Sequence, residues 1–213
     1  MDNKLYTMQP YKNSWTLVRN NSTDNTCCVV NVYQLANGVF LGVGIDNRLY
    51  IRQNLTEEWK PVNSGNSNFL TCCVISVTQA TDGTIFGVGT DNQLYTLKKD
   101  GDKFIWIGPI HTGPFLSISA TSDGRLIALG TDHKIYEVVI DYNNLYKTSS
   151  DKIYITDGSV SMNNYIKSIY AFTNDIIIGI DTNNSVFVKF MDHSGWEGPF
   201  PNSCCVKSAI TFH

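Results

Sequence analysis

Residues 42–50 of the chain read Gly42-Val43-Gly44-Ile45-Asp46-Asn47-Arg48-Leu49-Tyr50. Residues 87–95 repeat this motif with two changes, as Gly87-Val88-Gly89-Thr90-Asp91-Asn92-Gln93-Leu94-Tyr95. Weaker copies lie at residues 129–136 and 179–187, and the end of the motif opens the chain at residues 2–6. A motif that recurs at a fixed spacing is the signature of a repeat architecture. The chain is therefore expected to be built from copies of one structural unit.

Two series of aromatic residues give the length of that unit. The aromatics that end the motif copies are Tyr6, Tyr50, Tyr95, Tyr136 and Phe187, with spacings of 44, 45, 41 and 51 residues. A second aromatic follows each of them, and these are Trp15, Trp59, Trp106, Tyr154 and Trp196. Their spacings are 44, 47, 48 and 42 residues, if residues 143–150 are taken as an insertion. Both series average about 45 residues, so the period does not depend on the choice of series.

Each unit is expected to hold four short strands. In the best-defined unit, runs rich in β-branched and aromatic residues occupy 72–77, 84–88, 93–97 and 104–107. Asp-Gly or Asp-Asn pairs separate these runs, which is typical of tight hairpins. A stacked β-solenoid is the alternative, but its repeats are shorter and do not carry three tight hairpins each. Four strands in about 45 residues match one blade of a β-propeller.

The composition supports an all-β fold. Ala occurs 6 times and Glu 4 times, whereas Asn occurs 21 times. Strong helix formers are scarce, and residues that favour turns are abundant. We expect an all-β chain that forms a five-bladed β-propeller of four-stranded antiparallel blades, as a single domain spanning residues 1–213.

The closing blade of this ring is expected to be shared by the N- and C-termini. Residues 203–212 match the first strand of a unit, and residues 4–8 and 15–18 match the third and fourth strands. Neither end supplies the second strand, so the closing blade is short of one strand and the chain is about 13 residues shorter than five full units. Three explanations are open: a truncated chain, direct pairing of the two ends, or self-association in which another subunit completes the blade.

The charge and hydropathy of the chain exclude several classes of partner. Basic residues number 16 and acidic residues 19, for a net charge of −3, and no run of five like charges occurs. A phosphate-backbone binder needs a basic surface, so no nucleic-acid partner is expected. Apolar runs such as residues 176–178 are too short to insert into a membrane. The first residues lack a basic region followed by an apolar run, so no signal peptide is expected in this chain.

With these features, the chain resembles the tachylectin-2 and tectonin-type β-propeller lectins. The resemblance rests on the unit of about 45 residues, the hairpin that ends in Leu-Tyr or Ile-Tyr, and the Trp at the fourth strand. The Gly-Gly-Trp and Asp-Asn-Trp-Leu segments of tachylectin-2 do not occur in the sequence. The resemblance implies a non-catalytic lectin for glycans such as N-acetylated amino sugars, with one shallow site per blade or blade junction.

Doubled cysteines mark the start of three units. The pairs are Cys27-Cys28, Cys72-Cys73 and Cys204-Cys205, and the other two units carry Gly113-Pro114 and Asn164-Tyr165 at this place. Neighbouring strand residues face opposite sides, so both thiols of a pair cannot enter one core. Three interpretations stay open: free thiols, a disulfide between adjacent residues that forms a flat apolar ring against a ligand, or a metal cluster. No Cys-x-x-Cys spacing occurs and the four His are unpaired, so neither a metal site nor another cofactor is expected.

The tryptophans are the second group of candidate ligand-binding residues. Trp15, Trp59, Trp106 and Trp196 could stack on sugar rings, or they could pack between neighbouring sheets as one large aromatic per blade, which is the commoner role. The pairs Asp46-Asn47 and Asp91-Asn92 are expected to form hairpin turns, because both residue types tolerate positive φ.

Catalysis is not expected. The sequence contains no Gly-x-Ser-x-Gly, no phosphate-binding glycine loop and no His-Glu-x-x-His. Nearly all Asp residues fall in predicted turns, which leaves little for a pair of glycosidase carboxylates. Similar units, none distinguished by an acid, base or nucleophile, are typical of a multivalent binder.

We therefore expect a secreted or extracellular lectin with several similar sites formed by the four tryptophans and six cysteines. Glycosylation sequons at Asn20, Asn21, Asn54 and Asn183 are compatible with secretion. The alternative is a propeller scaffold that binds a protein or a small apolar ligand at the doubled-cysteine rim.

Overall fold

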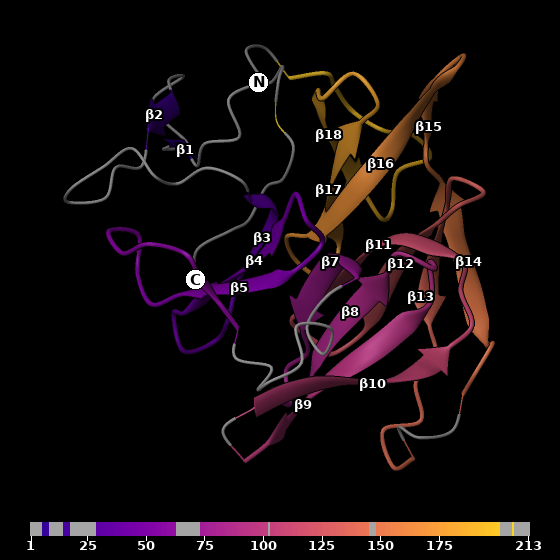
Figure 1. Cartoon of the computed structure of the whole chain (residues 1–213). Helices are drawn as coiled ribbons and strands as arrows, with labels where there is room; N and C mark the ends of the chain where they lie inside the picture. Colours follow the sequence, from indigo (N-terminus) through magenta and orange to yellow (C-terminus); the bar gives the residue numbers. More distant parts are fainter. Residues whose placement is uncertain are drawn as a thin grey trace.

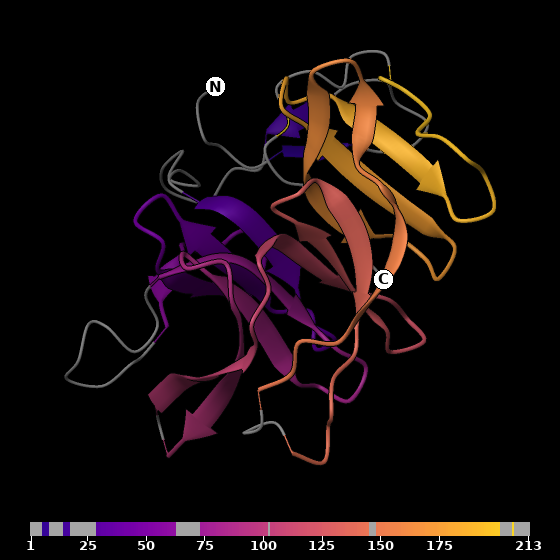
Figure 2. The ribbon, with the colours of Figure 1, turned by 90° about the vertical axis from the view of Figure 1, so that its right-hand side faces the viewer.

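The computed structural model describes residues 6–8, 15–17, 29–62, 73–101, 103–144, 148–200 and 206. All regular secondary structure in these residues is β-strand, which confirms the all-β prediction. Four antiparallel sheets of four strands each are arranged around a common centre as the blades of a β-propeller (Figure 1, Figure 2). In this part of the chain, no helix has the length and apolarity needed to cross a membrane.

The first three blades are simple meanders, in which strands that follow one another in sequence are also neighbours in the sheet. Blade one contains β3 (Val29–Gln34), β4 (Phe40–Gly44), β5 (Leu49–Arg52) and β6 (Lys60–Pro61). Blade two contains β7 (Val74–Gln79), β8 (Ile85–Gly89), β9 (Leu94–Asp100) and β10 (Lys103–His111). Blade three contains β11 (Phe115–Ala120), β12 (Leu126–Gly130), β13 (Lys134–Val138) and β14 (Lys152–Asp157). The first strand of each of these blades is the innermost one.

Blade four departs from this plan. It contains β15 (Ser159–Ser161), β16 (Asn164–Ala171), β17 (Ile176–Asp181) and β18 (Val186–Phe190) in that order. The strand predicted at Trp196 is wrong, because only a single bridge joins Val188 to Glu197 there. Pro199, which has no N–H, stands two residues further on and limits this ladder. The sheet instead gains β15, which pairs with the start of β16.

The number of blades differs from the prediction, because the described residues form four four-stranded blades and not five blades. The fifth unit is described only as a two-stranded sheet of β1 (Tyr6–Met8) and β2 (Trp15–Leu17). These strands coincide with the third and fourth strands predicted for the closing blade. The predicted first strand, residues 203–212, lies outside the described residues except for Val206.

Val206 continues the pattern by which each blade contacts the next. Its N–H donates to the carbonyl oxygen of Asn184 in blade four at 3.1 Å. The same bond joins the start of β7 to blade one, from Val74 to Asn47 at 3.1 Å, and the start of β11 to blade two. Val206 therefore follows blade four in the way that β7 and β11 follow the blades before them.

The hydrophobic core lies between the blades. One cluster joins blades one and two and includes Leu41, Leu49 and Val77. A second joins blades two and three around Phe86 and Phe115, and a third joins blades three and four. Blade-to-blade packing thus supplies the buried apolar surface that a single sheet could not enclose.

The hairpin tips between the second and third strands form as predicted. Asn47 and Asn92 have φ values of 58° and 64°, the left-handed conformation that asparagine tolerates. The Asp46 carboxylate accepts the Arg48 N–H at 3.1 Å and closes the turn from its own side chain. The turn-forming role predicted for the Asp-Asn pairs is therefore confirmed.

Candidate functional site

A β-bulge interrupts the innermost strand of every blade at the same place. The strand register shifts between Val29 and Asn31, and equivalent shifts occur at Val74/Ser76, Phe115/Ser117 and Ile166/Ser168. The extra residues are Val30, Ile75, Leu116 and Lys167. In a bulge, two residues oppose one on the partner strand, so the usual alternation of side chains is broken. Two consecutive side chains can then face the centre of the ring.

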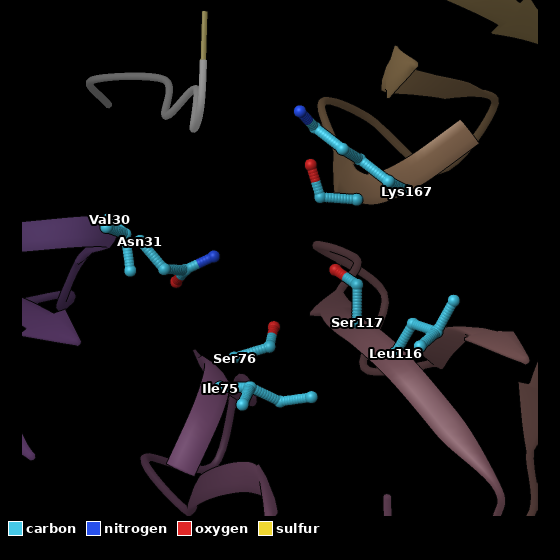
Figure 3. Close-up of a pocket in the computed structure, with 8 residues that line it drawn as sticks. Val30, Asn31, Ile75, Ser76, Leu116, Ser117 and Lys167 are labelled. Carbon is cyan, nitrogen blue, oxygen red and sulfur yellow. The ribbon is translucent and has the colours of Figure 1, made fainter. Parts of the chain in front are cut away.

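These four bulges line a central cavity of about 180 Å³. Its walls are the bulge residue and the residue after it from each blade, namely Val30, Asn31, Ile75, Ser76, Leu116, Ser117, Lys167 and Ser168. Figure 3 shows Asn31, Ser76 and Ser117 directed from three different strands toward a shared space, with Lys167 extending from β16. The four bulge residues thus form a layer of three aliphatic side chains and one lysine, and the residues that follow them form a polar layer.

The polar layer ties neighbouring inner strands together. The Ile118 N–H of β11 donates to Ser76 Oγ on β7 at 3.2 Å. The Ile169 N–H of β16 donates to Ser117 Oγ on β11 at 3.2 Å. These bonds satisfy backbone N–H groups of one innermost strand with a serine side chain of the preceding blade. Two of the four polar residues therefore have a structural role.

The other two polar residues, Asn31 and Ser168, leave atoms without partners. Asn31 is 6% exposed, and its Nδ2 donates to the Tyr170 hydroxyl in blade four at 3.2 Å. Its Oδ1 and the Ser168 Oγ are buried and have no hydrogen-bond partner in the described part of the chain. Buried polar atoms in proteins are nearly always hydrogen-bonded, so both atoms mark places where a ligand or water would be held.

Lys167 is the charged member of the cavity wall. Its Nζ donates to Asn184 Oδ1, at the hairpin tip between β17 and β18. Asn184 also accepts the Val206 N–H through its backbone carbonyl. Lys167 therefore brings a positive charge to the end of the cavity where the hairpin tips of the blades lie.

The doubled-residue positions lie at this same end, which we call the doublet rim: Cys73, Gly113-Pro114, Asn164-Tyr165 and the hairpin tips that contact them. Cys73 comes two residues before the bulge residue Ile75, and its carbonyl accepts the Thr90 N–H at 2.7 Å. The residue is exposed and has a φ of 70°. The pairing of adjacent cysteines stays a prediction. Cys27, Cys28, Cys72, Cys204 and Cys205 all lie outside the described residues.

Tyrosine and aspartate side chains brace the hairpin tips of the first three blades. In each, a tyrosine hydroxyl donates to an aspartate four residues earlier, and the pairs are Tyr50–Asp46 at 2.9 Å, Tyr95–Asp91 at 2.6 Å and Tyr136–Asp132 at 2.5 Å. Burial and the hydrogen bond to the carboxylate raise the pKa of Tyr95 and of Tyr136 to about 12. These hydroxyls stay protonated at neutral pH and hold the tips in place.

His111 at the end of β10 is fully buried and neutral. The Gly113 N–H donates to its Nδ1 at 3.1 Å, and its Nε2 lies 3.0 Å from the carbonyl oxygen of Asp151. A ring that accepts at one nitrogen and donates at the other carries no charge. Burial lowers the pKa of His111 and favours this form. Its role is to join blade two to the segment that leads into β14.

The described tryptophan side chains pack on their own blades. A Cβ added at Gly42 would lie 2.9 Å from Trp59, and one at Gly87 would lie 2.5 Å from Trp106. Trp196 lies against Gly179 in the same way. All three rings are half-buried, and the ring atoms nearest the glycines are Cζ3 and Cη2, so these contacts support the packing role. Trp15 lies on β2, and its side chain is outside the described residues.

Of the predicted site residues, the structure describes Trp59, Trp106, Trp196 and Cys73 with their side chains, and the three tryptophans lie in three different blades. The cavity residues that it does bring together were missed, because bulge residues such as Val30 and Leu116 look like ordinary strand residues. One signal was available: a small polar residue stands three positions after each doublet, as Asn31, Ser76, Ser117, Ser168 and, in sequence, Ser208. In the described residues no cluster of three His, Cys, Asp or Glu could hold a metal ion.

No protein-family model and no curated protein matches the chain. Among solved structures, it is similar to a putative gluconolactonase with a TM-score of 0.56 and 11% identity, over 94% of this chain and 72% of that chain. It is also similar to YCF48 from Cyanidioschyzon merolae, with a TM-score of 0.48, 12% identity, and coverage of 90% and 64%. YCF48 bound to D1 peptide gives a TM-score of 0.46, 11% identity, and coverage of 86% and 56%. The chain thus spans less than two-thirds of the length of the YCF48 chains.

At these identities the likeness shows the fold alone, and it agrees with a propeller built from four-stranded antiparallel blades. None of the three structures is a tachylectin or a tectonin. Membership of that lectin family and the absence of catalysis both stay predictions. The class that the fold and cavity define is a β-propeller scaffold.

Proposed function

We propose that the chain is a binding scaffold that holds a short segment of a partner protein at the doublet rim of its central cavity. The observation that carries this proposal is the cavity, to which four blades contribute equivalent residues. Val30, Ile75 and Leu116 offer apolar contact, and Lys167 offers a cation. A propeller that places one side chain from each blade around a common space is suited to grip a single inserted group.

The size and chemistry of the cavity favour an inserted group over a free small molecule. Pockets for small molecules usually have volumes of about 300–1,000 Å³. At about 180 Å³, this cavity matches a side chain or a chain end whose remainder stays outside. The described residues that line it include no carboxylate, imidazole or thiol, so they offer contact and hydrogen bonds in place of acid–base chemistry.

Glycan binding, which the lectin resemblance implies, has weaker support. Its motivation was one tryptophan per unit, and Trp59, Trp106 and Trp196 each lie against a glycine of their own blade. A glycan array screened beside the peptide experiment below separates the two functions.

The test is selection of binders from a phage library that displays random peptides with free C-termini, with the folded full-length chain as the target. Enriched peptides are then measured against two variants. Val30→Trp fills the cavity from a residue that belongs to none of the core clusters of the described residues. Val139→Trp is the matched control, because Val139 is 43% exposed on blade three, away from the cavity wall.

Enriched peptides are expected to bind at least about tenfold more weakly to Val30→Trp, since steric exclusion removes the contacts of the inserted group. Binding to Val139→Trp is expected to be unchanged. Peptides that bind all three proteins equally, or a positive glycan array with no peptide enriched, would overturn the proposal. Circular dichroism of the variants separates loss of binding from loss of fold.

A further inference from the structure

Two unsatisfied atoms and one cation define the chemistry that the central cavity can recognise. Asn31 Oδ1 is an acceptor without a donor, and Ser168 Oγ has neither donor nor acceptor in the described part of the chain. Lys167, the residue before Ser168, carries the charge. A matching ligand has an anionic acceptor for Lys167 and Ser168 and a nearby N–H for Asn31.

The bond between Lys167 and Asn184 is compatible with such a ligand. An ammonium group has three hydrogens and can donate to several acceptors at once, of which Asn184 Oδ1 is one. A hydrogen bond between an ammonium and a carboxylate is about twice as strong as one between neutral groups. A carboxylate is therefore the strongest acceptor that this end of the cavity can select.

The position of Asn31 limits where the N–H of the ligand can lie. The Asn31 amide is fixed by its bond to the Tyr170 hydroxyl, which spans from blade one to blade four. This bond leaves Oδ1 as the unpartnered atom in the cavity wall. A donor close to the carboxylate is needed to satisfy it, and a simple carboxylate such as acetate has none.

We propose that the cavity binds a carboxylate with an adjacent amide N–H, the chemistry found at the C-terminus of a peptide. The proposal rests on the proposed function and specifies the inserted group. Lys167 Nζ and the Ser168 hydroxyl donate to the carboxylate, and Asn31 Oδ1 accepts the N–H. Val30, Ile75 and Leu116 contact the side chain of the last residue.

The probes are three small molecules titrated into the ¹⁵N-labelled full-length chain and followed by NMR. N-acetylleucine carries a terminal carboxylate, an adjacent N–H and an apolar side chain. N-acetylleucinamide is the same molecule without the charge. N-acetylaspartic acid α-methylamide carries its carboxylate on a side chain, so it distinguishes an acidic side chain from a chain end.

N-acetylleucine is expected to shift the amide resonances of the bulge residues in a saturable way, and N-acetylleucinamide is expected to bind at least about tenfold more weakly. Lys167→Met is expected to remove the difference in affinity between N-acetylleucine and N-acetylleucinamide. Lys99→Met is the matched control, since it removes the same charge from an exposed position on β9. Asn31→Leu is expected to weaken the binding of N-acetylleucine, whereas the binding of acetate, titrated as a fourth probe, is expected to be unchanged.

Equal binding of the acid and the amide would overturn the inference, as would shifts that Lys167→Met leaves unchanged. A cavity that holds only water would give no shift with any probe, which also overturns it. Peptides that depend on the cavity but bind equally as acids and amides would leave the proposed function standing without this inference. A stronger response to the aspartate probe would assign the site to acidic side chains and refute recognition of a chain end.

Discussion

At the scale of single residues, the blades pair a glycine on the second strand with a tryptophan near the fourth. Gly87 and Trp106 show the reason, because a Cβ on the glycine would come within 2.5 Å of the ring. Blade three lacks the tryptophan and has Tyr154, which is 53% exposed. At the position equivalent to Gly87 this blade has Ala128, which is fully buried. Among these equivalent positions on the second strands, only the one in blade three, which lacks the tryptophan ring, carries a side chain.

The first prediction concerns this pairing. Gly87→Ala is expected to destabilise the fold by about 1–3 kcal/mol, the usual cost of forcing an extra methyl group into a packed site. Gly195→Ala is the matched control, because no atom lies within 4 Å of its added Cβ. Unfolding in urea measures the free energy of unfolding of both glycine variants. Adding Trp106→Tyr to Gly87→Ala is expected to restore part of the loss, and equal stabilities of the two glycine variants would contradict the packing role.

The two possible roles of the tryptophans could not be separated from the sequence alone. A regular spacing shows that Trp59, Trp106 and Trp196 occupy equivalent places, and both packing and sugar stacking produce such a spacing. The glycine that receives each ring lies about 17 to 19 residues earlier, on another strand. Only the fold brings the two together.

At the scale of elements, the hairpins of the first three blades share a device of their own. The aspartate side chain closes the turn and also accepts the tyrosine hydroxyl four residues later, as in Asp91 and Tyr95. Tyr95 therefore loses a hydrogen bond when it ionises, and its tyrosinate would stand beside a carboxylate.

The second prediction follows from the pKa of Tyr95, which is raised to about 12 from 10. A raised pKa means that the stabilisation is complete below pH 10 and is lost as the pH rises toward 12. Absorbance at 295 nm should show tyrosine ionisation near the top of this range, and Tyr95→Phe should reduce the amplitude of that step and leave the part that comes from Tyr136. Asp91→Asn should move the step to lower pH. If the absorbance that Tyr95→Phe removes titrates near pH 10, the assignment is contradicted.

Elements differ in how well the sequence predicts them. The hairpins were predicted correctly because Asn47 and Asn92 are residues that accept positive φ. The bulges were not, because a bulge changes the register of a strand without needing a particular residue, and Ile75 or Leu116 fits a regular strand equally well. The fourth strand predicted at Trp196 is not formed. Strand pairing depends on backbone N–H donors, and the spacing of the aromatic residues carries no information about them.

At the scale of the whole molecule, the repeat is less regular than its period suggests. The 45-residue period predicted the propeller and the position of β1 and β2, and it predicted a fifth blade of which the described residues show only these two strands. The path of the chain between β13 and β14 is also particular to one blade. There the Thr112 N–H donates to Ser149 at 3.0 Å and His111 contacts Asp151, so this segment fastens blade three to blade two.

The third prediction uses His111 as a reporter of this connection. Burial lowers its pKa below 6.5, so the unfolded chain takes up a proton at a higher pH than the folded chain does. The stabilisation is complete above pH 6.5 and is lost as the pH falls toward the lowered pKa. Urea unfolding between pH 7 and 5 should show a slope that His111→Gln reduces.

His193→Gln is the control for that experiment, because the His193 side chain is 56% exposed. This variant should keep the slope of the unmodified chain. If His111→Gln and the unmodified chain lose stability in parallel, then His111 is not the group that couples protonation to unfolding.

The bulges on the inner strands also affect how the sequence of such a chain can evolve. Because the bulged residue is the one that the ladder leaves unpaired, its identity is loosely tied to the stability of its sheet. The contrast between Lys167 and the aliphatic residues at the other three bulges illustrates this freedom. Mutations at these positions can alter what the ring selects one blade at a time, so the bulges are the natural starting points for engineering new specificity on this scaffold.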